Sequence, residues 1–366
     1  MQPLQETFDE LYRFRGGRLK DFETETLYDV QKLGALKLIA DLKLSFPKVP
    51  SIYVDFIDNS TLNASATKYK NQFFIGINSG TSLLNLDLFY KLLALPNILL
   101  DIGDVSLEKK HNKRLNFIYT DRGVEFKPYS DEELIAPNCK IRDSYVHLYS
   151  TWAFLFLVLH ECGHIIRGHV GYMGRGQSRF SLDEYPYTIT EKEYKDNFLS
   201  QIMEFDADAF AINHLLRLAD YAINHNEQLR NISPALYANW EHFTEVTIFS
   251  VYGLFKMLGL TVFDPNKVPY LSHPPTSIRV SKIIDFFNGY IPDRSIEKSI
   301  LKALNDAETG FLQIGGTTKA HEVLASAYSD KGNNYAKDLT NGWNDNYNLF
   351  QPYAYMQLLP VKTIPW

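Results

Sequence analysis

Cysteine is scarce in this chain. Only Cys139 and Cys162 occur among its 366 residues. Two cysteines cannot build the disulfide framework of a small secreted domain, so a reducing compartment is the simpler expectation. We therefore expect a cytoplasmic protein whose core forms without disulfides.

Long hydrophobic runs are missing as well. The longest, residues 152–159, falls far short of the roughly 20 apolar residues that cross a bilayer. The opening residues, MQPLQETFDELYRFRGG, lack a basic segment followed by an apolar one, which argues against a signal peptide. The sequence thus predicts a soluble protein with no membrane span.

Positive charge is not in excess. The formal net charge is −6 at pH 7, so the overall balance does not favour nucleic acid or an anionic membrane as a partner. Hydrophobic residues make up 45% of the chain and aromatic residues 14%. This composition favours a well-packed globular protein over long disordered segments.

Hydrophobic periodicity predicts an α+β fold that is mainly helical with a small mixed sheet. In the first part we expect a helix over 24–46, strands over 51–57 and 71–78, a helix over 81–95, and a segment at 62–69 that is a candidate edge strand. In the second part we expect helices over 144–170, 193–223, 234–259, 276–289 and 293–307.

Three segments follow from this pattern. Residues 1–49 form an N-terminal helical segment, and residues 50–290 form the main domain, with insertions near 97–143 and 171–192. Residues 291–366 contain one more helix and an extension whose role the sequence does not indicate. Three glycines within 171–176 favour a loop there, and we hypothesise that residues 171–190 form a lid over a cleft.

The stretch HECGH, residues 160–164, matches H-E-x-x-H. On a helix, His160 and His164 share a face and can reach one ion, while Glu161 is turned about 100° from His160. That position suits a base that takes a proton from a metal-bound water. The alternative is a helix with two surface histidines, because this pentapeptide also arises by chance.

A second acidic stretch supplies a third candidate ligand. In MEFDADAFA, Glu204 and Asp208 stand one helical turn apart, and the alanines between and after them would let two helices approach closely. We expect Glu204 to complete the three-ligand set of a catalytic zinc site. Asp208 would accept a hydrogen bond from the far nitrogen of His160. The alternative, a solvated acidic helix face, fits poorly with the apolar surroundings.

Four further residues leave alternatives open. His273 and Arg279 lie in SHPPTSIR, where either could donate to the carbonyl oxygen of a substrate, although a helix start with a surface arginine explains the residues alone. His169 points off the ligand face if the helix continues, so we expect it behind the ligands or in a structural role. Cys162 is expected to be a small buried residue rather than a ligand.

Taken in order, HECGHIIRGH, EFDADAFA and SHPPTSIR resemble a known family, the gluzincin metallopeptidases that include the CAAX prenyl endopeptidases and the HtpX heat-shock proteases. The likeness covers roughly residues 50–290. Those branches are embedded in membrane, whereas the soluble phage-exclusion protease Lit is similar in the same three elements. The resemblance to Lit implies a bacterial cytosolic endopeptidase that cuts a specific folded protein, with phage defence as one use.

The resemblance assigns roles to individual residues. It implies that His160, His164 and Glu204 bind one Zn²⁺ ion, that Glu161 is the catalytic base, and that His273 and Arg279 shape the cleft at the transition state. The family's substrate-binding edge strand resembles the segment Asn63, Ala64, Ser65 and Ala66. By strand addition, this segment would pair with an extended substrate.

The sequence therefore predicts a zinc-dependent endopeptidase that acts on a protein or peptide substrate, with Glu161 activating a zinc-bound water. Two rivals remain. One is a zinc-stabilised binding or regulatory module that has lost turnover, which would have no need for Glu161. The other is a helical scaffold without metal. The substrate, any latency and the oligomeric state are not indicated.

Overall fold

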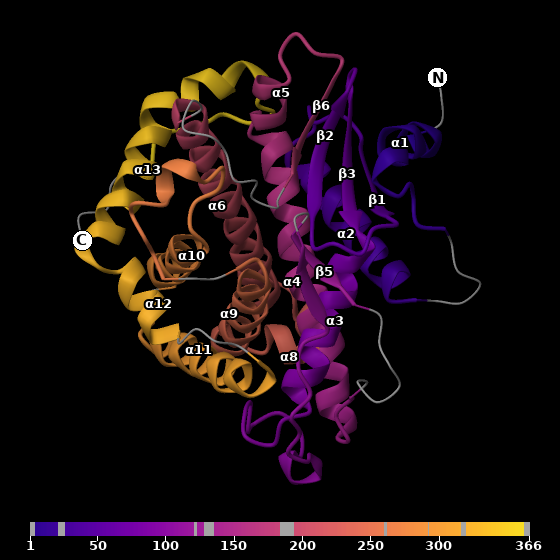
Figure 1. The fold of residues 1–366 in the computed structure, drawn as a ribbon, viewed down its shortest axis with the longest axis vertical. Helices are drawn as coiled ribbons and strands as arrows, with labels where there is room; N and C mark the ends of the chain where they lie inside the picture. The colour runs from indigo at the N-terminus through magenta and orange to yellow at the C-terminus, as the bar shows by residue number, and fades with distance from the viewer. Residues whose placement is uncertain are drawn as a thin grey trace.

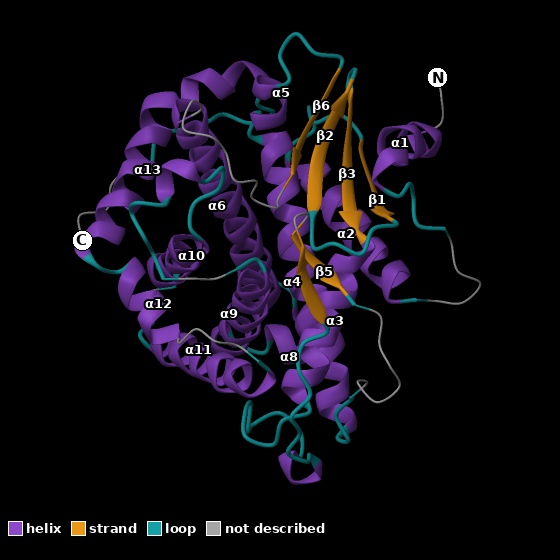
Figure 2. Ribbon diagram, in the orientation of Figure 1, coloured by secondary structure: helices purple, strands orange, loops and turns teal. Residues whose placement is uncertain are grey.

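A computed structural model describes residues 4–20, 26–120, 123–127, 135–183, 194–259, 262–291, 293–315 and 320–361. A small sheet stands on one side of the long helix α4, and most of the later helices lie on the other side (Figures 1 and 2). The α+β, mainly helical fold predicted from the sequence is confirmed.

The main sheet has four strands: β1 (Ile52–Ile57), β2 (Ala64–Tyr69), β3 (Gln72–Asn78) and β6 (Arg179–Asp183). Their order is β1-β3-β2-β6. β1 and β3 are parallel, whereas β2 runs antiparallel to both of its neighbours, so the sheet is mixed as expected. A separate hairpin consists of β4 (Phe117–Thr120) and β5 (Gly123–Phe126).

β2 is an inner strand, and the prediction that its segment forms the sheet edge is wrong. β6 pairs with its outer side, with Ser65 opposite Asp183 and Ala66 opposite Leu182. The sequence analysis predicted a loop over 171–190 and did not predict β6, because this strand is short and half polar. Its alternate residues Phe180 and Leu182 pack against the main core, and this packing defines the strand.

The helices carry most of the chain. Those that build the site are α4 (Lys140–Ile166), α5 (His169–Met173), α6 (Tyr194–His225) and α10 (Thr276–Tyr290). The others are α1 (Leu4–Tyr12), α2 (Leu27–Ser45), α3 (Ser79–Leu93), α7 (Glu227–Ile232), α8 (Pro234–Tyr237), α9 (Trp240–Met257), α11 (Ser295–Ile314), α12 (Ala320–Ala327) and α13 (Asp330–Phe350). Single 3₁₀ turns are η1 (Arg13–Arg15), η2 (Val105–Leu107), η4 (Val268–Tyr270) and η5 (Gln351–Tyr353).

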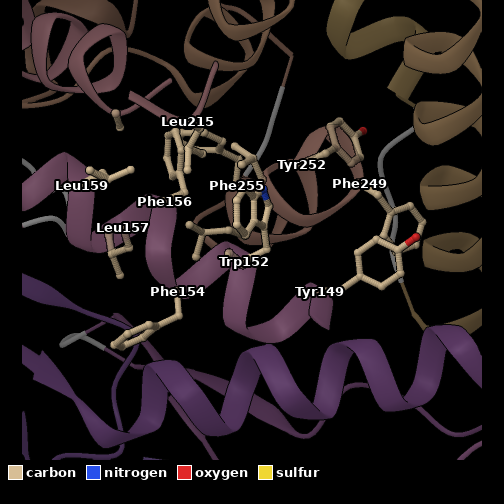
Figure 3. Close-up of a cluster of buried hydrophobic side chains, with 14 of the residues drawn as sticks. Tyr149, Trp152, Phe154, Phe156, Leu157, Leu159, Leu215, Phe249, Tyr252 and Phe255 are labelled. Carbon is tan, nitrogen blue, oxygen red and sulfur yellow. The ribbon is translucent and has the colours of Figure 1, made fainter. Parts of the chain in front are cut away.

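α4 is the central helix, and its apolar residues explain its burial. Figure 3 shows the aromatic side chains of α4 meeting those of α9 in one cluster. Tyr149 lies 4.9 Å from Phe249 between ring centroids, and Phe156 lies 6.0 Å from Phe255. The apolar run 152–159 is therefore part of the core face that fixes α4 between the sheet and the later helices.

Small residues bring α4 and α6 together at the level of the motif. A Cβ atom added at Gly163 would lie 3.2 Å from Cα of Ala207, so the two backbones are nearly in contact there. Ala211, one turn further along α6, is fully buried as well. The close approach expected from the alanines of α6 is present, and it places the acidic residues of α6 beside the histidines of α4.

The chain after residue 310 contains two helices that the sequence analysis did not predict. α13 buries Tyr335, Leu339, Trp343 and Phe350 in a second hydrophobic cluster with residues of α6. Its buried face uses aromatic residues among many asparagines, which weakens the aliphatic pattern that signals a helix. The division of the chain into three segments stays a prediction.

Within the described residues, every helix is either too short or too polar to cross a bilayer.

Candidate metal centre

The two motif histidines converge on one carboxylate. Nε2 of His160 and Nε2 of His164 lie 3.0 Å apart on α4. From α6, Oε2 of Glu204 lies 3.1 Å from Nε2 of His160, and Oε1 lies 3.2 Å from Nε2 of His164. Two imidazole nitrogens and one carboxylate thus face a common point.

This arrangement fits a metal ion. Zinc bonds nitrogen and carboxylate oxygen at about 2.0–2.2 Å, so two ligands of a tetrahedral ion stand roughly 3.3–3.5 Å apart. The ligand atoms of the three residues all lie within 4.8 Å of one another. Among the described residues no other group of three histidine, cysteine or acidic side chains is gathered this way. Two histidines and one glutamate leave a fourth position open, as a catalytic site requires.

The centre is almost closed to solvent. His160 is fully buried, and His164 and Glu204 are only 2% and 4% exposed. Burial acts to raise the pKa of Glu204, but the imidazoles of His273 and His164 and the contact with His160 hold it well below its ordinary value. A carboxylate is the form in which Glu204 would bind a metal ion.

His160 is held from behind by an ion pair. Its Nδ1 lies 2.9 Å from Oδ1 of Asp208. Arg279 donates to both oxygens of that carboxylate, from Nε at 2.6 Å and from Nη2 at 2.8 Å. Asp208 has the place predicted for it. Arg279 does not face the cleft as predicted, because this bidentate pair turns its guanidinium toward Asp208 and leaves it 2% exposed.

His164 has a longer support that the sequence analysis missed. Its Nδ1 lies 3.1 Å from Nδ1 of His169. Nε2 of His169 lies 3.2 Å from Oδ2 of Asp206, and Arg167 donates to both oxygens of that carboxylate. The signal was the second aspartate of EFDADAFA, two residues before Asp208.

The position of His169 follows from a break in the helix. α4 ends at Ile166, and Gly168 has a φ of +86°, the left-handed conformation that favours glycine. The chain turns there, so His169 begins α5 and swings back toward His164. The sequence analysis expected His169 behind the ligands or in a structural role, and it lies behind His164, although a turn of the chain rather than one uninterrupted helix puts it there. Burial lowers the pKa of His169 to about 4, so its imidazole is neutral at physiological pH.

The two remaining motif residues are both buried. Glu161 follows His160 on α4 and is 1% exposed. Cys162 is fully buried, and burial raises the pKa of its thiol, so it is a packing residue rather than a thiolate ligand.

His273 belongs to the centre. It precedes α10, and its Nε2 lies 3.5 Å from Oε2 of Glu204. Its Nδ1 lies 2.8 Å from the hydroxyl oxygen of Ser272. The alternative of an unrelated helix start does not describe this residue, because its ring is 7% exposed and faces the carboxylate of a candidate ligand.

The predicted substrate strand is already paired. The backbone N–H of Asn63 bonds the hydroxyl of Thr81 and its carbonyl accepts from Asn78. Ser65 and Ala66 pair with β6. The predicted lid is likewise structured in its described part, where α5 and β6 replace a loop, while 184–190 lies outside the described residues.

The comparisons with known proteins indicate a peptidase, which agrees with the geometry of the candidate metal centre. No curated protein and no solved structure matches the chain. Residues 108–300 match a protein family described as Peptidase U49. The match spans more than half of the chain and includes α4, α5, α6, α10 and the segment before α10 that contains His273. The chain therefore belongs to the peptidase U49 family.

Proposed function

We propose that this peptidase is a zinc-dependent endopeptidase. The observation that carries the proposal is the convergence of His160, His164 and Glu204, whose ligand atoms lie 3.0–3.2 Å apart. Glu161 follows His160 directly, in the position of the base in H-E-x-x-H. A structural zinc site is normally closed by four protein ligands, whereas three ligands and a neighbouring carboxylate suit catalysis.

A zinc ion held by these residues would polarise the scissile carbonyl and lower the pKa of a water molecule. Glu161 takes the proton from that water and later delivers it to the amine of the leaving peptide. Asp208 and Arg279 keep the ring of His160 in one tautomer and orientation.

His273 is the candidate for stabilising the tetrahedral intermediate. Negative charge builds on the substrate's carbonyl oxygen during hydrolysis, and a donor aimed at that oxygen contributes several kcal/mol, about 3 in a measured protease case. His273 lies beside Glu204 at the centre, whereas Arg279 is engaged with Asp208. We assign the donor role to His273 and a supporting role to Arg279.

The substrate is a polypeptide, and it needs a route to the centre. An extended peptide adds to a sheet edge, and the outer side of β2 is occupied by β6. β6 is held there by Thr67, whose hydroxyl bonds that of Ser181 at 3.0 Å, and by the ion pair of Arg15 with Asp183 at 2.6 Å. Pairing of a substrate with Ser65 and Ala66 therefore requires β6 to leave.

A disulfide between β2 and β6 tests that route. Thr67 and Ser181 are directly opposite in the register, so Thr67→Cys with Ser181→Cys can lock the two strands. Oxidised enzyme should bind zinc normally and cleave little, and reduction should restore cleavage. Equal rates in the two redox states would show that the substrate does not use this side of β2.

The variant Glu161→Gln tests the proposed function. It should retain zinc in metal analysis and lose cleavage, which is detected by comparing protein termini in cells that express the native protein or the variant. Glu297→Gln, an exposed change on α11, is the control and should cleave normally. Absence of zinc from the native protein after reconstitution would contradict the proposal.

A second candidate function has one observation in its favour. The near-complete burial of the ligands is also what a zinc-stabilised regulatory module would show. The two functions differ at Glu161, because such a module has no use for a base. If the native protein and Glu161→Gln produce the same termini in cells while both retain zinc, the module is the better description.

A further inference from the structure

His169 is a buried imidazole to which the chemistry above gives no part. Its Nδ1 contacts Nδ1 of His164 at 3.1 Å. Nε2 of His164 faces the other two candidate ligand atoms, at 3.0 Å from His160 and 3.2 Å from Glu204. Since Nδ1 and Nε2 lie on different sides of an imidazole ring, His169 stands behind His164 rather than at the ion.

The hydrogens of this pair can be assigned from the geometry. A histidine that binds metal through Nε2 carries its hydrogen on Nδ1. Nδ1 of His164 therefore donates, and Nδ1 of His169 accepts. The one ring hydrogen of His169 is then on Nε2, which lies 3.2 Å from Oδ2 of Asp206. Each ring is left with a single tautomer.

The end of this chain of contacts that lies away from His164 is packed against aromatic rings. Arg167 donates to both oxygens of Asp206, and its guanidinium carbon lies 4.6 Å from the centre of the Trp343 ring. Phe350 packs against His169 with ring centroids 5.1 Å apart. Both aromatic residues come from α13, so the C-terminal part of the chain encloses the support of His164.

We propose that His169, Asp206 and Arg167 are positioning residues that fix the tautomer and orientation of His164 for metal binding. The proposal rests on the zinc centre proposed above. In it, these three residues fix the ring of His164 as Asp208 and Arg279 fix the ring of His160. None of the three touches substrate. They act by holding one ligand ready, which raises the affinity for zinc.

Two replacements of His169 separate positioning from packing. His169→Phe keeps the ring volume and removes both polar contacts. His169→Gln keeps an acceptor and a donor on one short amide, so it can bridge His164 and Asp206. Loss of such a partner lowers zinc affinity by about 10–100-fold. We expect His169→Phe to show that loss in chelator competition and His169→Gln to recover most of it.

The cobalt-substituted protein gives a readout that does not depend on activity. The visible spectrum of Co²⁺ should change in His169→Phe and return toward the native form in His169→Gln. Asp206→Asn should weaken zinc binding while His169 stays in place, which keeps the test decisive if His169→Phe does not fold. His214→Gln on α6, whose ring bonds a backbone carbonyl, is the control and should bind zinc as the native protein does.

Three results would overturn the proposal. Native zinc affinity and an unchanged cobalt spectrum in His169→Phe would show that the ring only fills space. A loss as large as that of Glu204→Gln, with no recovery in His169→Gln, would show that His169 binds the metal itself. A native protein that binds no zinc would overturn both this inference and the proposed function, whereas the first two results leave the proposed function standing.

Discussion

The two histidines of the motif are supported in different ways. His160 contacts a carboxylate directly, and that carboxylate is clamped by Arg279. His164 contacts its carboxylate only through a second imidazole, and Arg167 clamps the far end. Each arginine also stacks on an aromatic ring at 4.6 Å, Phe255 in one support and Trp343 in the other. Both histidines are therefore supported by a carboxylate that an arginine clamps, and the support of His164 contains one additional ring, His169.

The support of His164 needs the additional ring of His169 because His160 and His164 lie at different distances from the end of α4. His160 and Asp208 lie on α4 and α6, which cross closely enough for direct contact. His164 is one turn nearer the end of α4, where the chain leaves the helix at Gly168. His169 at the start of α5 spans the space to Asp206. The longer support is therefore tied to a helix end and to the C-terminal part of the chain, and the shorter one to the three helices α4, α6 and α10.

The largest effect is expected at Glu204, the candidate ligand that faces both histidines. Glu204→Gln removes the charge that faces both histidines and should lower zinc affinity by more than the ~10–100-fold that outer partners contribute. Chelator competition measures it. A Glu204→Gln protein with native affinity would mean that the ion is held by another set of residues, and the comparison of the two supports would lose its basis.

The next effect compares the two aspartates. Asp208→Asn weakens a direct contact with His160, so we expect a loss near the upper end of ~10–100-fold in zinc affinity. Asp206→Asn acts through His169 and should cost about tenfold. Both variants are measured in the same assay. An equal loss of zinc affinity, or a larger loss in Asp206→Asn, would show that His169 transmits the support of Asp206 to His164 without weakening it.

A change at Gly168 addresses the helix end itself. Gly168→Ala puts a side chain at a φ of +86°, which costs about 1–2 kcal/mol. The added Cβ would also lie 2.7 Å from the backbone nitrogen of Ala354. We expect lower thermal stability and a few-fold weaker zinc binding, through displacement of His169. Gly176→Ala is the matched control, because its φ is +75° and nothing lies within 4 Å of its Cβ position.

The smallest effects are expected at the arginines. Arg279→Lys and Arg167→Lys keep the charge but cannot donate to two carboxylate oxygens in the same plane. We expect a few-fold loss of zinc affinity for each, larger for Arg279, because Asp208 touches a ligand directly. Full native affinity in Arg279→Lys would show that charge alone, without the bidentate geometry, holds the carboxylate.

Much of the fold was accessible from the sequence. The helices around 144–170, 193–223, 276–289 and 293–307 and both strands at 51–57 and 71–78 lie close to where periodicity put them. Each of these elements buries one continuous apolar face, and such a face gives a periodic hydrophobic pattern in the sequence. β6 and α13 lack such a pattern. One is five residues long, and the other buries scattered aromatic residues among asparagines.

The candidate site was predicted in its ligands and less well in its supports. Spacing along one helix indicates His160 and His164, whereas Glu204 comes from a second acidic stretch and His273 from a third motif. Arg279 was assigned to the cleft because a sequence shows a charge without its partner. His169 was expected behind the ligands, but its contacts with His164 and Asp206 were not predicted, because the turn at Gly168 depends on what packs against it, including Ala354 and Phe350 from the end of the chain.

The sequence by itself determined that His160 and His164 can contribute to one metal centre, because a helix places positions four apart on one face whatever surrounds it. That Glu204 meets them depends on how α6 packs against α4. Only the tertiary structure decided how that centre is supported and reached. The contacts of His169 with Asp206, of Arg279 with Asp208 and of β6 with β2 join residues that are far apart in the chain, and such contacts depend on how helices and strands pack rather than on local spacing.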